Sequence, residues 1–264
     1  MNPNPCYFRE YALMMTHTRP EMTAIDALMS HVSIREYTDQ PVDDAVLQRI
    51  LDAARRAPTS SNTQTYSIVV VRDAETKRQL AELTGQQKHV ETCAVFLAFV
   101  ADLSRLKRAA ALHGTVPVIN TELSMVAIVD ASLVGMAAQV AAESLGLGTV
   151  MIGGARNQPE AIARLLNLPQ GAFVVYGMCL GYPAEVPPQK PRLPEAEVVH
   201  YERYRQPADD SLLHAYDADL AAHYRAQRRT SPDAAWTGVL ARQFSQPRRP
   251  FLRAVLEKMG FSFS

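Results

Sequence analysis

Five short segments of the chain combine small polar, amide, basic and glycine residues in a pattern that suits one extended ligand. They are residues 31–35 (HVSIR), 59–64 (TSSNTQ), 85–89 (GQQKH), 153–154 (GG) and 190–192 (KPR). Guanidinium and ammonium groups bind phosphate, and hydroxyl and amide groups donate hydrogen bonds to a polar ring. Each segment alone is as typical of a turn, a helix cap or a solvated surface. Together they predict a site for a ligand with a phosphate at one end and a flat polar ring at the other.

The common catalytic templates are missing from this sequence. It contains no Gly-x-Ser-x-Gly elbow, no His-Glu-x-x-His pair, no Walker loop and no Gly-x-Gly-x-x-Gly after a strand. Two of its seven histidines, His31 and His89, lie in the polar segments. Because a lone histidine more often caps or packs than binds a metal, we predict no metal site.

The order of these segments resembles that of the FMN-dependent nitroreductases, and within them the NADPH-preferring group of oxygen-insensitive nitroreductases and flavin reductases. The similarity runs from about Met22 to the C-terminus. It is carried by SIREY (33–37), APTSSNTQ (57–64), TGQQKHV (84–90), AESLGLG (142–148), IGG (152–154) and KPRLP (190–194).

This resemblance implies an FMN site and a role for each segment. The phosphate would be held by His31, Ser33, Lys190 and Arg192, and the ribityl chain and ring edge by Thr59, Ser60, Ser61, Gln64 and Gln87. Arg35 would lie by the pyrimidine edge, where a cation favours the reduced flavin. The backbone of Gly153 and Gly154 would approach the reactive ring nitrogen, and Val32 and Ile152 complete the predicted cofactor-binding residues.

The C-terminal part of the chain carries a basic excess. From Arg225 to Lys258 there are eight basic and two acidic residues. The resemblance implies that arginines of this region contact the 2′-phosphate of NADPH, the candidates being Arg225, Arg228, Arg229 and Arg249. Arg249 matches best, and we expect a preference for NADPH over NADH. The alternative is that these arginines contact no ligand and only keep the surface of a helix hydrated.

The activity implied is a ping-pong reaction. NADPH would deliver hydride to FMN and leave, and an electron-poor acceptor, a nitroaromatic or a quinone, would then take two electrons. No side chain is expected to act as a catalytic acid, base or nucleophile, because the flavin carries the hydride. Two alternatives stay open. One is an NADPH:FMN flavin reductase that supplies reduced flavin, and the other is a non-catalytic flavin-binding sensor.

A long apolar helix is the most prominent predicted element. Residues 125–144 are almost entirely apolar, with Asp130 and Glu143 as the charged exceptions. These charges argue against a membrane span, and a helix that is apolar on all sides must run through a core or between subunits. We expect the helix over 121–147 to be buried at the interface of a homodimer, where a charge in place of Val134 would disrupt the dimer and release FMN.

Shorter elements alternate along the rest of the chain. Strands are predicted over 66–71, 94–100, 149–152 and 172–180, and helices over 22–31, 42–54, 74–83, 102–111, 158–166 and in the region after 209. This alternation alone suggests a doubly wound sheet. The resemblance implies instead an α+β fold, with a mixed central β-sheet wrapped by helices in an intertwined homodimer and with FMN between the subunits.

The amino-acid composition limits the kinds of partner, the size of the core and the compartment that we expect. A net charge of zero gives no reason to expect nucleic acid or an anionic membrane as a partner, so the expected partners are small-molecule electron acceptors and a second copy. The 47% hydrophobic content supports a sizeable core. Three separated cysteines fit a reducing cytoplasm. We interpret 1–21 as a disordered leader, 22–200 as the FMN-binding core and 201–264 as a helical extension contributing to the dimer and to NADPH binding.

Overall fold

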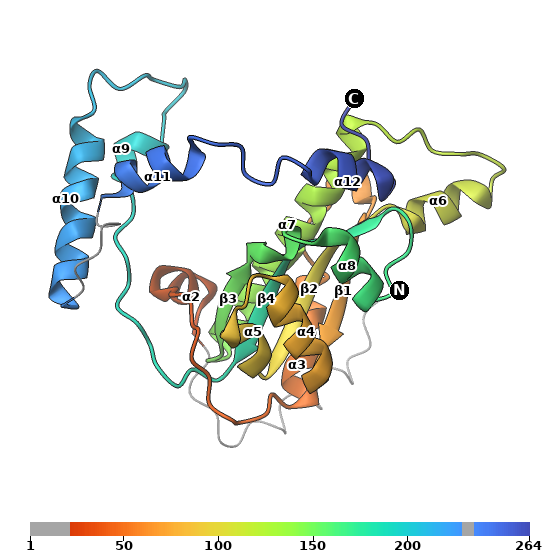
Figure 1. Ribbon diagram of the computed structural model, residues 1–264, viewed down its shortest axis with the longest axis horizontal. Coiled ribbons are helices and arrows are strands. Elements are labelled where there is room, and N and C mark those ends of the chain that lie inside the picture. Colours follow the sequence, from red (N-terminus) through yellow and green to blue (C-terminus); the bar gives the residue numbers. More distant parts are fainter. Residues whose placement is uncertain (1–21, 229–234) are drawn as a thin grey trace. The chain divides into compact units, whose positions relative to one another are not determined.

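The computed structural model describes residues 22–228 and 235–264. The chain divides into two compact units (Figure 1), one running to Pro187 and resuming over Leu252–Ser264, the other comprising Pro188–Phe251. The leader predicted over 1–21 lies outside the described residues. The domain boundary predicted at residue 200 stays a prediction.

The first unit is built on a four-stranded sheet in the order β1-β2-β4-β3. Its strands are β1 (Tyr66–Val71), β2 (Val95–Asp102), β3 (Gly148–Ile152) and β4 (Ala172–Gly181). All three strand pairs are antiparallel, and an isolated parallel bridge joins Ser33 to Thr149. The doubly wound parallel sheet suggested by alternation is therefore wrong, because a helical connection can return the chain in either direction. The α+β fold is confirmed, with the parallel bridge as the source of its mixed character.

Helices cover both faces of this sheet (Figure 1). On one face, Leu80, Val90 and Ile162 from three different helices pack with the strands. On the other face, Ile50 and Val134 do the same. The helices of this unit are α2 (Ala24–Ser30), α3 (Asp44–Ala54), α4 (Ala74–Leu83), α5 (Lys88–Thr92), α6 (Ser104–Ala111), α7 (Thr121–Ser144), α8 (Pro159–Leu165) and α12 (Leu252–Lys258), with short 3-10 turns η1 (Ser60–Asn62) and η2 (Gly153–Arg156).

The long apolar helix α7 begins where Asn120 caps it, its side chain accepting a hydrogen bond from the backbone N–H of Leu123 at 3.0 Å. It ends at Ser144, three residues before the predicted end at 147, because Gly146 adopts a positive φ of 81°. Val134 is fully buried in the core of its own unit. A charge at that position would therefore disturb the fold itself, and the proposed test of the interface at Val134 is wrong.

One side of α7 remains apolar and open. Met125, Val129, Leu133 and Met136 are 53%, 50%, 40% and 38% exposed. Among the described residues, α7 is the helix long and apolar enough to cross a membrane. However, its two interior carboxylates are buried against protein donors, so α7 packs as a helix of the protein core.

The second unit is helical. It contains α9 (Glu195–Val198), α10 (Ser211–Ala226) and α11 (Trp236–Phe244). Tyr216 of α10 meets Trp236 of α11 edge to face, with ring centroids 5.7 Å apart, and the Asp217 carboxylate accepts the backbone N–H of Thr237 at 3.0 Å. The aromatic contact, together with the hydrogen bond between Asp217 of α10 and the first turn of α11, holds the two helices against each other.

Candidate functional site

The first polar segment runs beside β3. The backbone N–H of Ile34 donates to the carbonyl of Thr149 at 2.9 Å, and Ser33 forms the parallel bridge to the same residue. A Cβ at Gly148 would lie 2.5 Å from the Ile34 side chain, so only glycine allows the segment to lie this close. The Ile34 side chain is buried in the core, whereas the side chain of the next residue, Arg35, is exposed.

His31 is held at the start of this segment by helix α7. Its Nδ1 lies 2.8 Å from Oε1 of Glu143 and 3.0 Å from the amide nitrogen of Gln139. The hydroxyl of Thr149 donates to the same Glu143 oxygen at 2.6 Å. The Glu143 side chain is 10% exposed and the His31 side chain 23%. This half-buried network fixes the orientation of the imidazole ring.

A second polar segment, the 59–65 loop, is held by the other carboxylate of α7. Oδ1 of Asp130 accepts the backbone N–H of Ser60 at 3.0 Å. Oδ2 accepts the N–H of Thr65 at 3.0 Å and its hydroxyl at 2.8 Å, with the hydroxyl of Thr63 at 3.3 Å. Asp130 is fully buried, so both ends of the loop are fixed to the core.

The middle of the 59–65 loop faces outward in an unusual backbone conformation. Ser61, Asn62 and Gln64 have positive φ values of 48°, 56° and 51°, a region that residues other than glycine adopt rarely. Their side chains are exposed, as is that of Ser60. The loop therefore presents a row of hydroxyl and amide groups, as the predicted contacts to a ribityl chain and ring require.

The third and fourth segments meet each other at Gly154. A Cβ on Gly154 would lie 2.1 Å from the carbonyl oxygen of Thr84 and 2.7 Å from the Gln87 amide, and that amide donates to the same carbonyl at 2.8 Å. The close approach that requires glycine here is thus to the chain itself. The side chain of Ile152 is buried in the core, which leaves its backbone for a ligand.

His89 lies in this region with an unmet polar atom. Its Nε2 is buried and has no hydrogen-bond partner among the described residues. Burial lowers the pKa of His89, and the nearby Arg35 guanidinium lowers it further, against an opposing effect of Glu36. Arg35 of the first segment therefore lies near enough to the 84–89 segment to affect the imidazole of His89.

The remaining predicted residues belong to the second unit. Arg192 donates to the carbonyl of Lys190 at 3.3 Å, and the Lys190 ammonium lies 5.6 Å from the centre of the Tyr224 ring. Arg225 is in the last turn of α10, and Arg228 follows it with a positive φ of 55°. Burial and the neighbouring Arg248 lower the pKa of Arg249. Arg229 lies outside the described residues.

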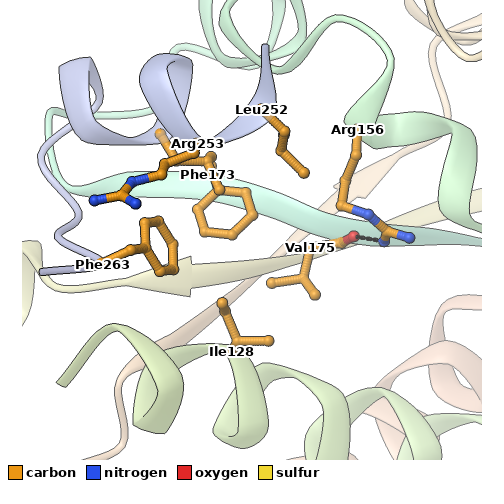
Figure 2. Close-up of a pocket in the computed structure, with 8 residues that line it drawn as sticks. Ile128, Arg156, Phe173, Val175, Leu252, Arg253 and Phe263 are labelled. Atoms are coloured by element: carbon orange, nitrogen blue, oxygen red, sulfur yellow. Dashed lines mark hydrogen bonds between the residues drawn. The ribbon is translucent and has the colours of Figure 1, made fainter. Parts of the chain in front are cut away.

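A cavity of about 480 Å³ lies elsewhere in the first unit. Figure 2 shows residues of its mainly apolar lining, with Phe173 and Phe263 beside each other and the Arg156 guanidinium donating to the Val175 carbonyl. None of the residues predicted from the sequence lines it. The predicted site is instead an assembly of exposed polar segments.

Sequence reasoning did not assign the residues that support these segments. The sequence points to Asp130 and Glu143 only as charges that argue against a membrane span, and it gives Gln139 and Thr149 no role in the site. The signal that could have identified them was present, because a carboxylate in an apolar helix must find buried donors.

Comparisons with known proteins agree with this geometry. The Nitroreductase family model matches residues 28–182, and the model of the Nitroreductase family, C-terminal domain, matches 190–264. The chain is 40% identical over 238 residues to an oxygen-insensitive NADPH nitroreductase of Salmonella typhimurium, covering 90% of this chain and 98% of that protein. It is 38% identical to an FMN reductase [NAD(P)H] of Bacillus subtilis, covering 90% and 97%.

Solved structures show the same architecture. The structure of B. megaterium NfrA2 superposes with a TM-score of 0.87 at 40% identity, covering 91% of this chain and 98% of that one. The fold is of the α+β class, and the family and relatives that the chain matches are those of oxidoreductases. The chain belongs to the nitroreductase family.

Proposed function

We propose that the protein is an NADPH-dependent FMN oxidoreductase that reduces nitroaromatics and quinones by two electrons. The observation that carries this proposal is the gathering of the 31–35, 84–89 and 153–154 segments around β3 and α7, in a chain whose relatives are named for NADPH nitroreductase and FMN reductase activity.

The residues of the first unit fit FMN by their chemistry. The 31–35 segment offers an imidazole, a hydroxyl and a guanidinium, which suit a phosphate and a polar ring edge. The exposed Ser60, Ser61 and Gln64 suit ribityl hydroxyls. The buried Nε2 of His89 has no partner in the part of the chain that the structure describes, and an unmet buried polar atom of this kind is typical of a ligand site.

Each residue would then have a limited task. Bound FMN would supply the hydride chemistry. His31 and Ser33, with Lys190 and Arg192, would bind the phosphate, and Arg35 would hold a positive charge at the polar edge of the ring. The 59–64 loop and Gln87 would orient the ribityl chain and ring. No acid, base or nucleophile is required of the protein, so catalysis depends on binding and orientation.

The proposal includes a homodimer, which the positions where the segments attach to α7 support. Glu143 lies thirteen residues after Asp130, which separates the two attachment points by roughly 20 Å along the helix. A second copy with its α7 in the opposite direction across a two-fold axis would bring one copy's 59–65 loop towards the other copy's His31 segment. The open apolar side of α7, at Val129 and Leu133, is the surface such a copy would cover.

The proposal also includes NADPH as the electron donor and the cytoplasm as the cellular compartment. Arg225, Arg228, Arg229 and Arg249 would contact the 2′-phosphate of NADPH, as the basic excess of this region favours. Cys93 and Cys179 are both free and buried, which suits the reducing cytoplasm proposed as the location.

The visible spectrum of the purified protein under anaerobic conditions, before and after one equivalent of NADPH, tests the proposal. We expect a flavin spectrum that bleaches on addition of NADPH. A protein that stays colourless after FMN is supplied would exclude FMN as its cofactor. A yellow protein that does not bleach would overturn NADPH as the donor and support a flavin-binding sensor.

A flavin reductase is the second candidate, because a relative 38% identical to the chain is named FMN reductase. Turnover of NADPH with free FMN as the acceptor, compared with a nitroaromatic or a quinone, separates the two activities. Higher efficiency with free FMN would assign the chain to the supply of reduced flavin.

A further inference from the structure

Helix α7 buries two carboxylates in a stretch that is otherwise apolar. Asp130 is fully buried and Glu143 is 8% exposed. Desolvating a carboxylate is unfavourable, and an apolar residue of similar volume is often as stable at such a position. We therefore expect the two carboxylates of α7 to have a role beyond stabilising the fold, and their hydrogen-bond partners indicate that role.

Among the described residues, the hydrogen-bond donors to Asp130 all belong to the 59–65 loop, and they lie at both ends of that loop. Ser60 donates its backbone N–H to one carboxylate oxygen, and Thr65 donates its backbone N–H to the other. Between these two points lie the three residues with positive φ. Such conformations persist only where the surroundings enforce them. Asp130 thus holds the loop in the shape that turns its hydroxyl and amide groups outward.

Glu143 acts on His31 in a different way. It uses one oxygen, which receives the Thr149 hydroxyl and lies against Nδ1 of His31. With Nδ1 engaged towards α7, an anion must be met by the other ring nitrogen. A carboxylate behind an imidazole orients the ring that meets the anion.

We propose that Asp130 and Glu143 are positioning residues for the flavin, Asp130 for its ribityl chain and ring and Glu143 for its phosphate. This inference rests on the proposed function. It assigns Asp130 of one copy and Glu143 of the other to opposite ends of one cofactor, and the two ends can be told apart, because riboflavin lacks the phosphate of FMN.

The experiment compares FMN and riboflavin binding to flavin-free protein by quenching of flavin fluorescence. In Asp130→Asn the amide must turn its NH₂ group towards the backbone N–H of either Ser60 or Thr65, so one donor meets another donor. We expect the affinities for FMN and for riboflavin to fall together, by about tenfold or more.

Glu143→Gln keeps an oxygen for Thr149 and His31 and removes only the charge. We expect FMN affinity to fall by about tenfold, with riboflavin affinity within twofold of wild type. The matched control is Glu122→Gln, an exposed carboxylate in the first turn of the same helix, which should leave both affinities unchanged.

Where Asp130→Asn does not fold, Thr65→Val replaces it. This change removes one hydroxyl from Asp130 at nearly constant volume and should lower both affinities by a smaller factor. A Glu143→Gln protein that loses both flavins equally, or Asp130→Asn and Thr65→Val proteins that keep both affinities, would overturn the inference. A wild-type protein that binds neither flavin would instead overturn the proposed function.

Discussion

At the scale of single residues, the contacts that the candidate site can make to a ligand depend on which polar atoms already have a hydrogen-bond partner within the protein. Nδ1 of His31 is engaged by Glu143, and the amide of Gln87 is engaged by the Thr84 carbonyl. The buried Nε2 of His89 is not engaged by any described residue. The sequence predicts which residue types bind the ligand, but it does not tell which of their atoms remain for that ligand.

Arg249 is the residue on which coenzyme choice should depend. Arg249→Ala removes a guanidinium that would pair with the 2′-phosphate, which NADH lacks. We expect the ratio of kcat/KM for NADPH to that for NADH to fall by about tenfold or more. The control is Arg248→Ala, whose guanidinium lies 5.9 Å from the Phe244 ring and should matter little. An unchanged ratio in Arg249→Ala would count against the predicted NADPH site.

His89 should make the stability of the flavin-free protein depend on pH. Burial lowers its pKa in the folded state, so below about pH 6.5 the unfolded chain binds a proton that the folded chain does not. Stability should therefore be full above this pH and fall as the pH drops towards the folded-state pKa. Urea unfolding of wild type and His89→Gln across pH 5 to 8 checks this. Parallel curves for the two proteins would exclude His89 as the cause.

At the scale of elements, α7 combines three roles that the sequence does not separate. Its buried side packs on the sheet through Val134 and Ala138, its carboxylates hold two polar segments, and its open side remains apolar. The sequence shows a helix that is apolar all round. Which residue faces which neighbour was decided by packing, and this is why Val134 was the wrong position for a test of the interface.

Leu133 is the better position for that test. It is 40% exposed in the single chain, so Leu133→Asp should leave the subunit folded while placing an unpaired carboxylate in the proposed interface, at a cost of several kcal/mol. Light scattering should show loss of the dimer, with the circular dichroism of a folded chain. Leu112→Asp, at a position 84% exposed, is the control. A folded Leu133→Asp protein that stays dimeric would refute the assigned surface.

At the scale of the whole molecule, flavin binding and dimerisation should be coupled. If each FMN needs the 59–65 loop of one copy and the His31 segment of the other, a monomer offers only part of the site. Dilution below the dimer dissociation constant should therefore release FMN, and added FMN should stabilise the dimer by mass action. Analytical ultracentrifugation with flavin and protein detection measures both. Flavin that sediments with a monomer would contradict the shared site.

The sequence by itself determined where the elements lie and which residues could bind the cofactor. The strand over 66–71 and the helix over 74–83 match β1 and α4, because hydrophobic periodicity is a local property. Only the tertiary structure decided the direction of the strands and the partners of the buried charges. Asp130 meets Ser60 seventy residues away, and Glu143 meets His31 at a separation of 112 residues. Such contacts depend on how the whole chain packs, and no local spacing encodes them.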